Sequence, residues 1–178
     1  MSGDHPLERL NYFYGRLLSA EDLTAEQNYF IEKQQLHNRY LHGWGVVSGL
    51  GVREQNGGIV VDPGVAIDCA GHELVLTAPT LVAIPSGVRD TFVTLKYVEE
   101  MVRPVPVVLP ASDDSSDPPV QFSRIREGCI VELLQKNPAA NHQGMGPKSP
   151  GCGASHPLPL ARLTKKARRW VVALMSRR

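Results

Sequence analysis

The residues best suited to bind a metal ion lie in the second half of the chain. His142, Cys152 and His156 share a Pro- and Gly-rich stretch, and the Cys-x3-His spacing is compatible with zinc. A structural zinc site needs four ligands, usually including a Cys-x2-Cys or His-x3-His pair, and the sequence has neither pair. Cys69 or Cys129 would have to supply a ligand from a strand. The sequence therefore predicts no metal and no cofactor, with these three residues as the candidate ligands if a metal is bound.

Common catalytic motifs are absent from the sequence. It has no G-x-S-x-G or S-x-x-K motif and no P-loop. Glu99 and Glu100 are adjacent, so in a strand they point to opposite sides and make a poor acid–base pair. Asp68, His72 and Glu73 form the best polar cluster, but they surround a turn and are interpreted as turn residues. We therefore expect a protein that is not an enzyme.

The sequence predicts a helix over residues 24–42, and the remaining chain is organised around it. Its start is marked by Ser19 ahead of two acidic residues and by a T-x-x-Q capping box, Thr24 to Gln27, so we place the first full turn at Ala25. Acidic residues gather in its N-terminal half and basic residues in its C-terminal half, as the helix dipole favours. Gly43 supplies the stop.

A partly aromatic stripe along this helix has two interpretations. Tyr29, Leu36 and Tyr40 recur at helical spacing, which predicts an amphipathic helix packed on the following sheet. The tyrosines could also face another subunit, because Tyr and Trp are enriched at interfaces. Trp44, between two glycines, is expected to anchor the corner between helix and strand.

The aromatic trio upstream of the helix is either an N-terminal strand or an arm that docks on a neighbouring molecule. The sequence leaves both possibilities open. With this trio included, the candidate subunit-interface residues are Tyr12, Phe13, Tyr14, Tyr29, Tyr40 and Trp44.

The chain after Val52 alternates short apolar runs with turn sequences, which is typical of β-structure. We expect an α+β protein in which the N-terminal helix packs on a small, mainly antiparallel β-sandwich or barrel. Two Pro- and Gly-rich stretches, 103–123 and 136–159, are predicted as long loops. The arm, helix and Trp44 corner (1–52) and the β-domain (53–178) are expected to form one compact unit. The predicted strands cover 46–52, 59–61, 65–68, 73–77, 81–84, 91–99, 130–134, 160–164 and 170–175. Strands 65–68 and 73–77 flank a turn at Ala70-Gly71 and are expected to pair as a hairpin.

The composition of the chain disfavours two classes of binding partner, nucleic acids and membranes. Nineteen basic and eighteen acidic residues give a formal charge of +1, so we expect no nucleic-acid partner. The N-terminus lacks the apolar run of a signal peptide, and no stretch approaches the roughly 18 apolar residues of a membrane span. Three scattered cysteines agree with a reducing compartment. We expect a protein made in the cytoplasm, without membrane insertion.

The stretch from Leu10 to Val52 resembles a signature of structural proteins from phage tails and related contractile injection systems. That signature runs from an aromatic-Gly-Arg-Leu-Leu segment to Leu-His-Gly-Trp-Gly-Val-Val-x-Gly-Leu, and a weaker likeness continues over 61–76. The matching segments are Tyr14-Gly15-Arg16-Leu17-Leu18, Ala20-Glu21-Asp22, Glu26-Gln27-Asn28-Tyr29, Leu36-His37-Asn38-Arg39 and Leu41 to Leu50.

The resemblance implies a non-catalytic baseplate or tail-associated subunit. Such a protein would dock other subunits of the particle and copies of itself through its arm, helix and loops, and would move from the cytoplasm into the virion or injection particle on assembly. Similar proteins can carry more cysteines in the second loop, where this chain has only Cys152, which further weakens a metal assignment. The alternative is a β-module that binds a carbohydrate or a cell-surface ligand.

Overall fold

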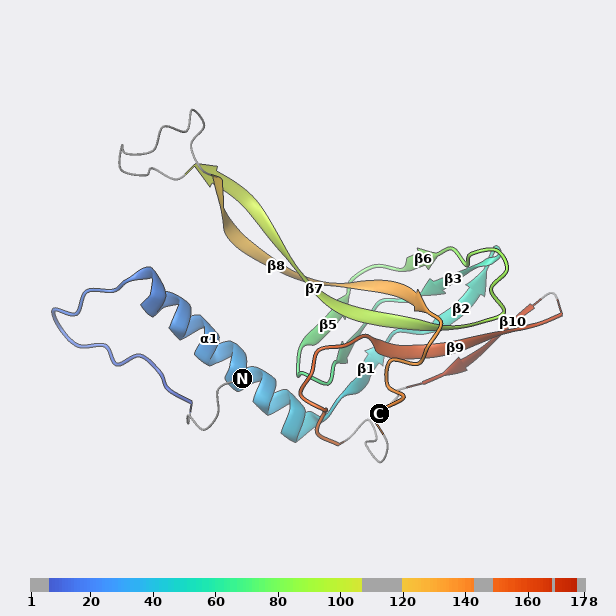
Figure 1. The fold of residues 1–178 in the computed structure, drawn as a ribbon, viewed down its shortest axis with the longest axis horizontal. Coiled ribbons are helices and arrows are strands. Elements are labelled where there is room, and N and C mark those ends of the chain that lie inside the picture. Colours follow the sequence, from blue (N-terminus) through green and yellow to red (C-terminus); the bar gives the residue numbers. More distant parts are fainter. Residues whose placement is uncertain (1–6, 107–119, 143–148, 168, 176–178) are drawn as a thin grey trace.

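A computed structural model describes residues 7–106, 120–142, 149–167 and 169–175 (Figure 1). In these residues one α-helix, α1 (Ala20–His37), continues into a π-helical turn, η1 (Asn38–His42), and ten strands follow. The strands are β1 (Gly45–Gly49), β2 (Val52–Gln55), β3 (Gly58–Val61), β4 (Gly64–Ile67), β5 (Glu73–Leu76), β6 (Thr80–Val82), β7 (Asp90–Pro106), β8 (Val120–Leu134), β9 (Leu158–Lys166) and β10 (Arg169–Leu174).

The strands form three antiparallel sheets. Their orders are β1-β4-β5, β2-β3-β6 and β10-β9-β7-β8. The predicted α+β class with mainly antiparallel strands is therefore confirmed, and the described strands of the β-domain are divided among three sheets. The predicted pairing of 65–68 with 73–77 is also confirmed, because Val65 lies opposite Val75 in the β4–β5 ladder.

One hydrophobic core joins the three sheets. Leu74 of β5, Ile59 of β3 and Leu95 of β7 are completely buried, and Leu160 of β9 is nearly so. Burying a side chain of this size contributes roughly 2 kcal/mol relative to leaving it in water. Trp44 belongs to the same core, so the predicted anchor of the helix-to-strand corner is present.

The helix begins five residues earlier than the predicted first turn at Ala25. Ser19 is the N-cap: its Oγ accepts the backbone N–H of Asp22 at 3.2 Å, and the Asp22 carboxylate accepts the Ser19 N–H at 3.1 Å. The hydroxyl of Thr24 instead donates to the carbonyl of Ala20 within the helix. The predicted stop is confirmed, because Gly43 ends the helical segment with φ of 68°.

Two single substitutions distinguish these starts. Ser19→Ala is expected to lower helix stability by about 1 kcal/mol because it removes the cap, whereas Thr24→Ala is expected to leave it unchanged or slightly higher because alanine is the better helix former. Hydrogen exchange of the amides in residues 21–26 measures the difference. Faster exchange in Thr24→Ala than in Ser19→Ala would contradict the Ser19 cap.

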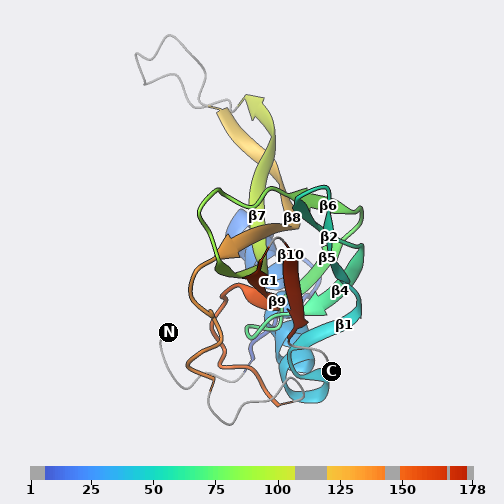
Figure 2. The ribbon, with the colours of Figure 1, turned by 90° about the vertical axis from the view of Figure 1, so that its right-hand side faces the viewer.

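The prediction that the helix packs on a sheet is wrong. No residue of α1 is buried, and the helix projects away from the three sheets (Figures 1 and 2). The end of the helical segment is joined to the β-domain by hydrogen bonds: the Asn38 amide of η1 donates to the carbonyl of Gly71 at 2.9 Å and to Glu73 at 3.2 Å. Within the described residues, no helix has the length and apolar character needed to cross a membrane.

The predicted loop over 103–123 is also partly wrong. Strands β7 and β8 pair as far as Pro106 and Val120 and form a long two-stranded ribbon beyond the core (Figure 1). Strand β9 pairs with β7 only up to Leu95, so the outer edge of the distal ribbon has no further strand in the part of the chain that is described. Proline is tolerated at such an edge because its missing N–H has no ladder partner to lose. The remainder of this loop, and 143–148 of the second, lies outside the described residues.

Candidate docking surface and Cys/His cluster

The arm and helix together expose a set of large apolar side chains. We define the arm–helix surface as these residues, each of which is at least 44% exposed: Tyr12, Phe13, Tyr14, Leu17, Leu18, Leu23, Phe30, Ile31, Leu36, Tyr40 and Leu41. Exposed apolar side chains that no other described part of the chain covers are typical of a protein interaction site.

The arm is held against the helix by polar contacts. The Arg16 guanidinium forms an ion pair with Asp22 at 2.8 Å and donates to the carbonyl of Asn11 at 2.8 Å. Asp22 is also part of the helix cap, so the arm and the first turn share one network. Residues 7–19 contain no strand, so the interpretation of the aromatic trio as an N-terminal strand is wrong, and docking of the arm on a neighbour stays a prediction.

The predicted interface residues differ in accessibility. The trio Tyr12, Phe13 and Tyr14 is exposed. Tyr40 is also exposed, whereas Tyr29 is half-buried against the edge of Phe30, with ring centroids 5.3 Å apart. Trp44 is only 4% exposed and so cannot present its ring to a neighbouring subunit in this conformation. We therefore leave Trp44 out of the docking surface.

A groove between α1 and the β7–β8 ribbon adds residues that the sequence interpretation missed. Phe30 and Ile31 form its helical side, and Met101, Phe122 and Ile125 form its ribbon side. All five side chains are substantially exposed. Phe122 was assigned to a loop from the sequence, so no pattern linked it to the helix.

The turn between β4 and β5 is organised by a buried carboxylate. Asp68, 1% exposed, accepts hydrogen bonds from the backbone N–H groups of Ala70 and His72 at 2.9 Å, and its second oxygen lies 2.8 Å from His72 Nδ1. The hydrogen bond to Asp68 raises the pKa of His72, whose ring stacks on Tyr97 with centroids 4.1 Å apart. These hydrogen bonds stabilise the turn, which confirms the interpretation of Asp68 and His72 as turn residues.

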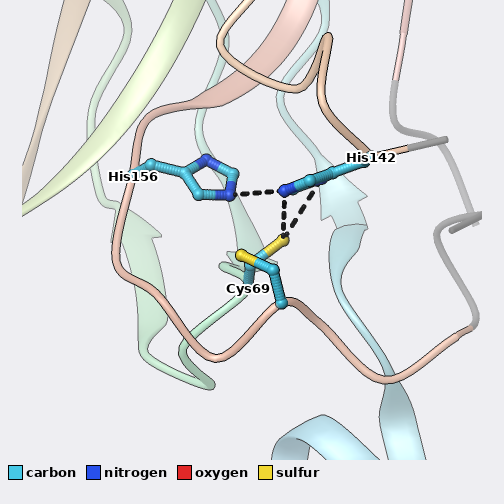
Figure 3. Close-up of side chains that lie close together, drawn as sticks. Cys69, His142 and His156 are labelled. Carbon is cyan, nitrogen blue, oxygen red and sulfur yellow. Dashed lines mark hydrogen bonds between the residues drawn. The ribbon is translucent and has the colours of Figure 1, made fainter.

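Four potential metal ligands meet beside this turn. Cys69, His142, Cys152 and His156 each contribute one ligand atom, and these atoms all lie within 4.8 Å of one another. His142 Nε2 is 2.9 Å from His156 Nε2, and His142 Nδ1 is 3.7 Å from Cys69 Sγ (Figure 3). The three candidate ligands from the sequence are therefore brought together, and Cys69 joins them from the turn after β4, not from a strand.

Burial in the cluster disfavours the charged forms of the Cys69 thiol and the His142 imidazole. Burial raises the pKa of the Cys69 thiol to about 12. Burial and the neighbouring His156 lower the pKa of His142. One edge of the cluster is closed by Trp44, whose ring packs edge-to-face on His142 with centroids 5.4 Å apart. Cys129, the other cysteine considered from the sequence, lies opposite Tyr97 in the β7–β8 ladder and is not a member.

Sequence comparisons find no relatives, whereas the fold has known counterparts. No protein-family profile and no curated protein sequence matches the chain. A chain in the cryo-electron microscopy structure of the type VI secretion system TssK-TssF-TssG baseplate subcomplex aligns with 94% of this chain, with a TM-score of 0.53 and 12% identity. The crystal structure of TssK aligns with 96%, with a TM-score of 0.51 and 17% identity.

The alignment covers only part of these counterparts. This chain spans 60% of the first structure's chain and 41% of the second. At these identities the similarity shows a shared fold, extending over nearly the whole of this chain.

Proposed function

We propose that this chain is a non-catalytic structural subunit of a phage-tail-like contractile injection particle, in its baseplate or tail-associated region. The arm–helix surface docks neighbouring subunits, including a second copy of the chain, so that the protein forms a homo-oligomer. It is made in the cytoplasm and becomes part of the particle on assembly.

The observation that carries this proposal is the unburied helix α1. An 18-residue helix with no buried residue gains little from its own domain, because most helical stability in proteins comes from packing an apolar face. Its exposed Phe30, Ile31 and Leu36, together with the exposed aromatic arm, offer apolar area to a neighbouring subunit. A neighbouring subunit that covers this surface would supply the missing packing.

The fold comparison supports the class of particle. Both solved counterparts are proteins of a type VI secretion baseplate, which is a phage-tail-like assembly, and the match covers more than nine-tenths of this chain. The signature between Leu10 and Val52 supports the same class independently, because it rests on residue identities and not on backbone shape.

Light scattering at several protein concentrations tests the homo-oligomer. We expect a discrete oligomer for the natural protein, and dissociation to monomer when Tyr12, Phe13 and Tyr14 are all changed to Ser. The reason is that buried aromatic anchors dominate interface energetics. Removing three of them is expected to weaken association at least 100-fold.

A matched variant separates this effect from a general loss of surface hydrophobicity. Val75, Leu81 and Val171 are exposed apolar residues on β5, β6 and β10, outside the arm–helix surface. Changing these three to Ser is expected to leave the oligomer intact. A natural protein that stays monomeric at every concentration would overturn self-association and favour the carbohydrate- or cell-surface-binding module.

A further inference from the structure

We infer that Cys69, His142, Cys152 and His156 bind one structural Zn²⁺ ion in a tetrahedral Cys2His2 site. The inference does not depend on the docking proposal, since none of the four residues belongs to the arm–helix surface. The site would join three segments that are far apart in the sequence: the β4–β5 turn, the turn after β8, and the segment leading into β9.

The spacing of the ligand atoms fits a zinc ion at their centre. With usual Zn–N and Zn–S bond lengths, tetrahedral ligand atoms are separated by about 3.3 Å for two nitrogens and about 3.8 Å for two sulfurs. Here the two histidine Nε2 atoms are 2.9 Å apart, and Cys69 Sγ lies 3.9 Å from His142 Nε2. All four ligand atoms lie within 4.8 Å of one another, so side-chain shifts of up to about 1 Å bring them to the ideal geometry.

The orientation of His156 is already that of a metal ligand. Its Nδ1 lies 3.2 Å from the carbonyl oxygen of Pro157, which can only accept a hydrogen bond, so the proton resides on Nδ1. This tautomer leaves the Nε2 lone pair directed at His142 and the cluster (Figure 3). A backbone carbonyl that holds the non-ligating nitrogen is the usual support of zinc-bound histidine.

The backbone around Cys152 is packed tightly onto Cys69. Gly153 donates its N–H to the Cys69 carbonyl at 3.1 Å. A Cβ at Gly151 would lie 2.2 Å from the same oxygen, so this approach requires glycine. The two cysteines are thus held together by contacts that need no metal, and the site is formed in advance of binding.

The charge balance favours zinc in this environment. Two thiolates and two neutral imidazoles neutralise the double charge of Zn²⁺, so the complex carries no net charge into a partly buried position. Zinc binds cysteine as the thiolate, so both cysteines would lose their protons when the ion binds. Four protein ligands complete the coordination shell and leave no position for water, as in structural zinc sites.

Metal analysis of the purified full-length protein tests the site. Protein produced in zinc-supplemented medium and purified under reducing conditions is expected to contain one zinc ion per chain by mass spectrometry of the metal content. Cobalt(II) added to the metal-free protein is expected to give the absorption bands of a tetrahedral site with thiolate ligands. Cys152→Ser and His156→Gln are each expected to weaken binding on the order of 100-fold, since each removes one of four ligands.

The third cysteine provides the matched control. Cys129→Ser is expected to keep one zinc per chain and the same cobalt spectrum, because Cys129 lies outside the cluster. Cys152 is exposed, so its replacement by Ser leaves the core in place, and circular dichroism verifies the fold. The inference is overturned if the natural protein holds no stoichiometric zinc and gives no cobalt bands. A Cys69–Cys152 disulfide in the reduced preparation would overturn it as well.

Discussion

Asp68→Ala is expected to lower the free energy of unfolding by about 3 to 5 kcal/mol, because the buried carboxylate is the shared acceptor of several hydrogen bonds. The carboxylate accepts two backbone N–H groups and pairs with His72, and it also accepts the hydroxyl of Ser155 at 3.3 Å. Alanine leaves the partly buried N–H groups of Ala70 and His72 without their acceptor, and an unsatisfied buried donor costs about 1 to 3 kcal/mol.

Urea unfolding followed by circular dichroism measures this cost, with chelator present so that metal binding makes no contribution. Asp62→Ala is the matched control, because Asp62 forms an exposed ion pair with Arg53 at 3.3 Å. An exposed pair of this kind is worth less than about 1 kcal/mol. Equal losses in the two variants would show that the Asp68 turn does not organise the β4–β5 connection.

Gly64→Ala is expected to cost about 3 kcal/mol by overpacking backbone against backbone. A Cβ at Gly64 would lie 2.3 Å from the carbonyl oxygen of Ser48 and 2.4 Å from the nitrogen of Leu50. Gly64 pairs with Gly49 at the end of the β1–β4 ladder, next to the bulge between Val46 and Ser48. The methyl group would push β1 away from β4 and draw the buried Leu50 out of the core.

The control for this variant is a glycine in another strand, where an added methyl group would meet no close atom. A Cβ at Gly128 of β8 would meet only a methyl of Val98 at 3.9 Å, which is an ordinary contact. Gly128→Ala is expected to be neutral or to stabilise by up to about 1 kcal/mol, because alanine loses less backbone entropy on folding. Denaturant unfolding of both variants gives the comparison, and a Gly64→Ala midpoint at or above the Gly128→Ala midpoint would contradict the steric argument.

Local sequence patterns predicted the parts of the fold that depend on local chemistry. Gly43 was predicted to stop the helix, and Ala70-Gly71 to turn the chain between β4 and β5, because both roles need a particular backbone conformation. The sequence offered two possible helix starts, at Ser19 and at Thr24. Only the structure shows that Ser19 forms the capping hydrogen bonds. The distal ribbon was missed because the argument from proline applies to central strands only.

The Cys/His cluster and the docking surface depend on contacts between residues far apart in the chain. Such contacts cannot be recognised from a single sequence. Cys152 and His156 were recognised from their spacing, but Cys69 lies 73 residues before His142 and is brought to it only by the packing of two turns. Likewise, Tyr29 and Trp44 looked like equal interface candidates. In the structure Tyr29 packs against Phe30 and Trp44 lies in the core, so both are less accessible than Tyr40 and the aromatic trio.

The β7–β8 ribbon divides the molecule into two tiers of stability. Its distal half carries exposed side chains such as Val105 and Phe122, whereas Val93 at its base is completely buried. A two-stranded ribbon is marginally stable by itself in water. We therefore expect its outer amides to exchange with solvent through local opening, and those of the core to exchange only on global unfolding. Evolution can therefore reshape the distal ribbon for a new neighbour without endangering the fold that carries it.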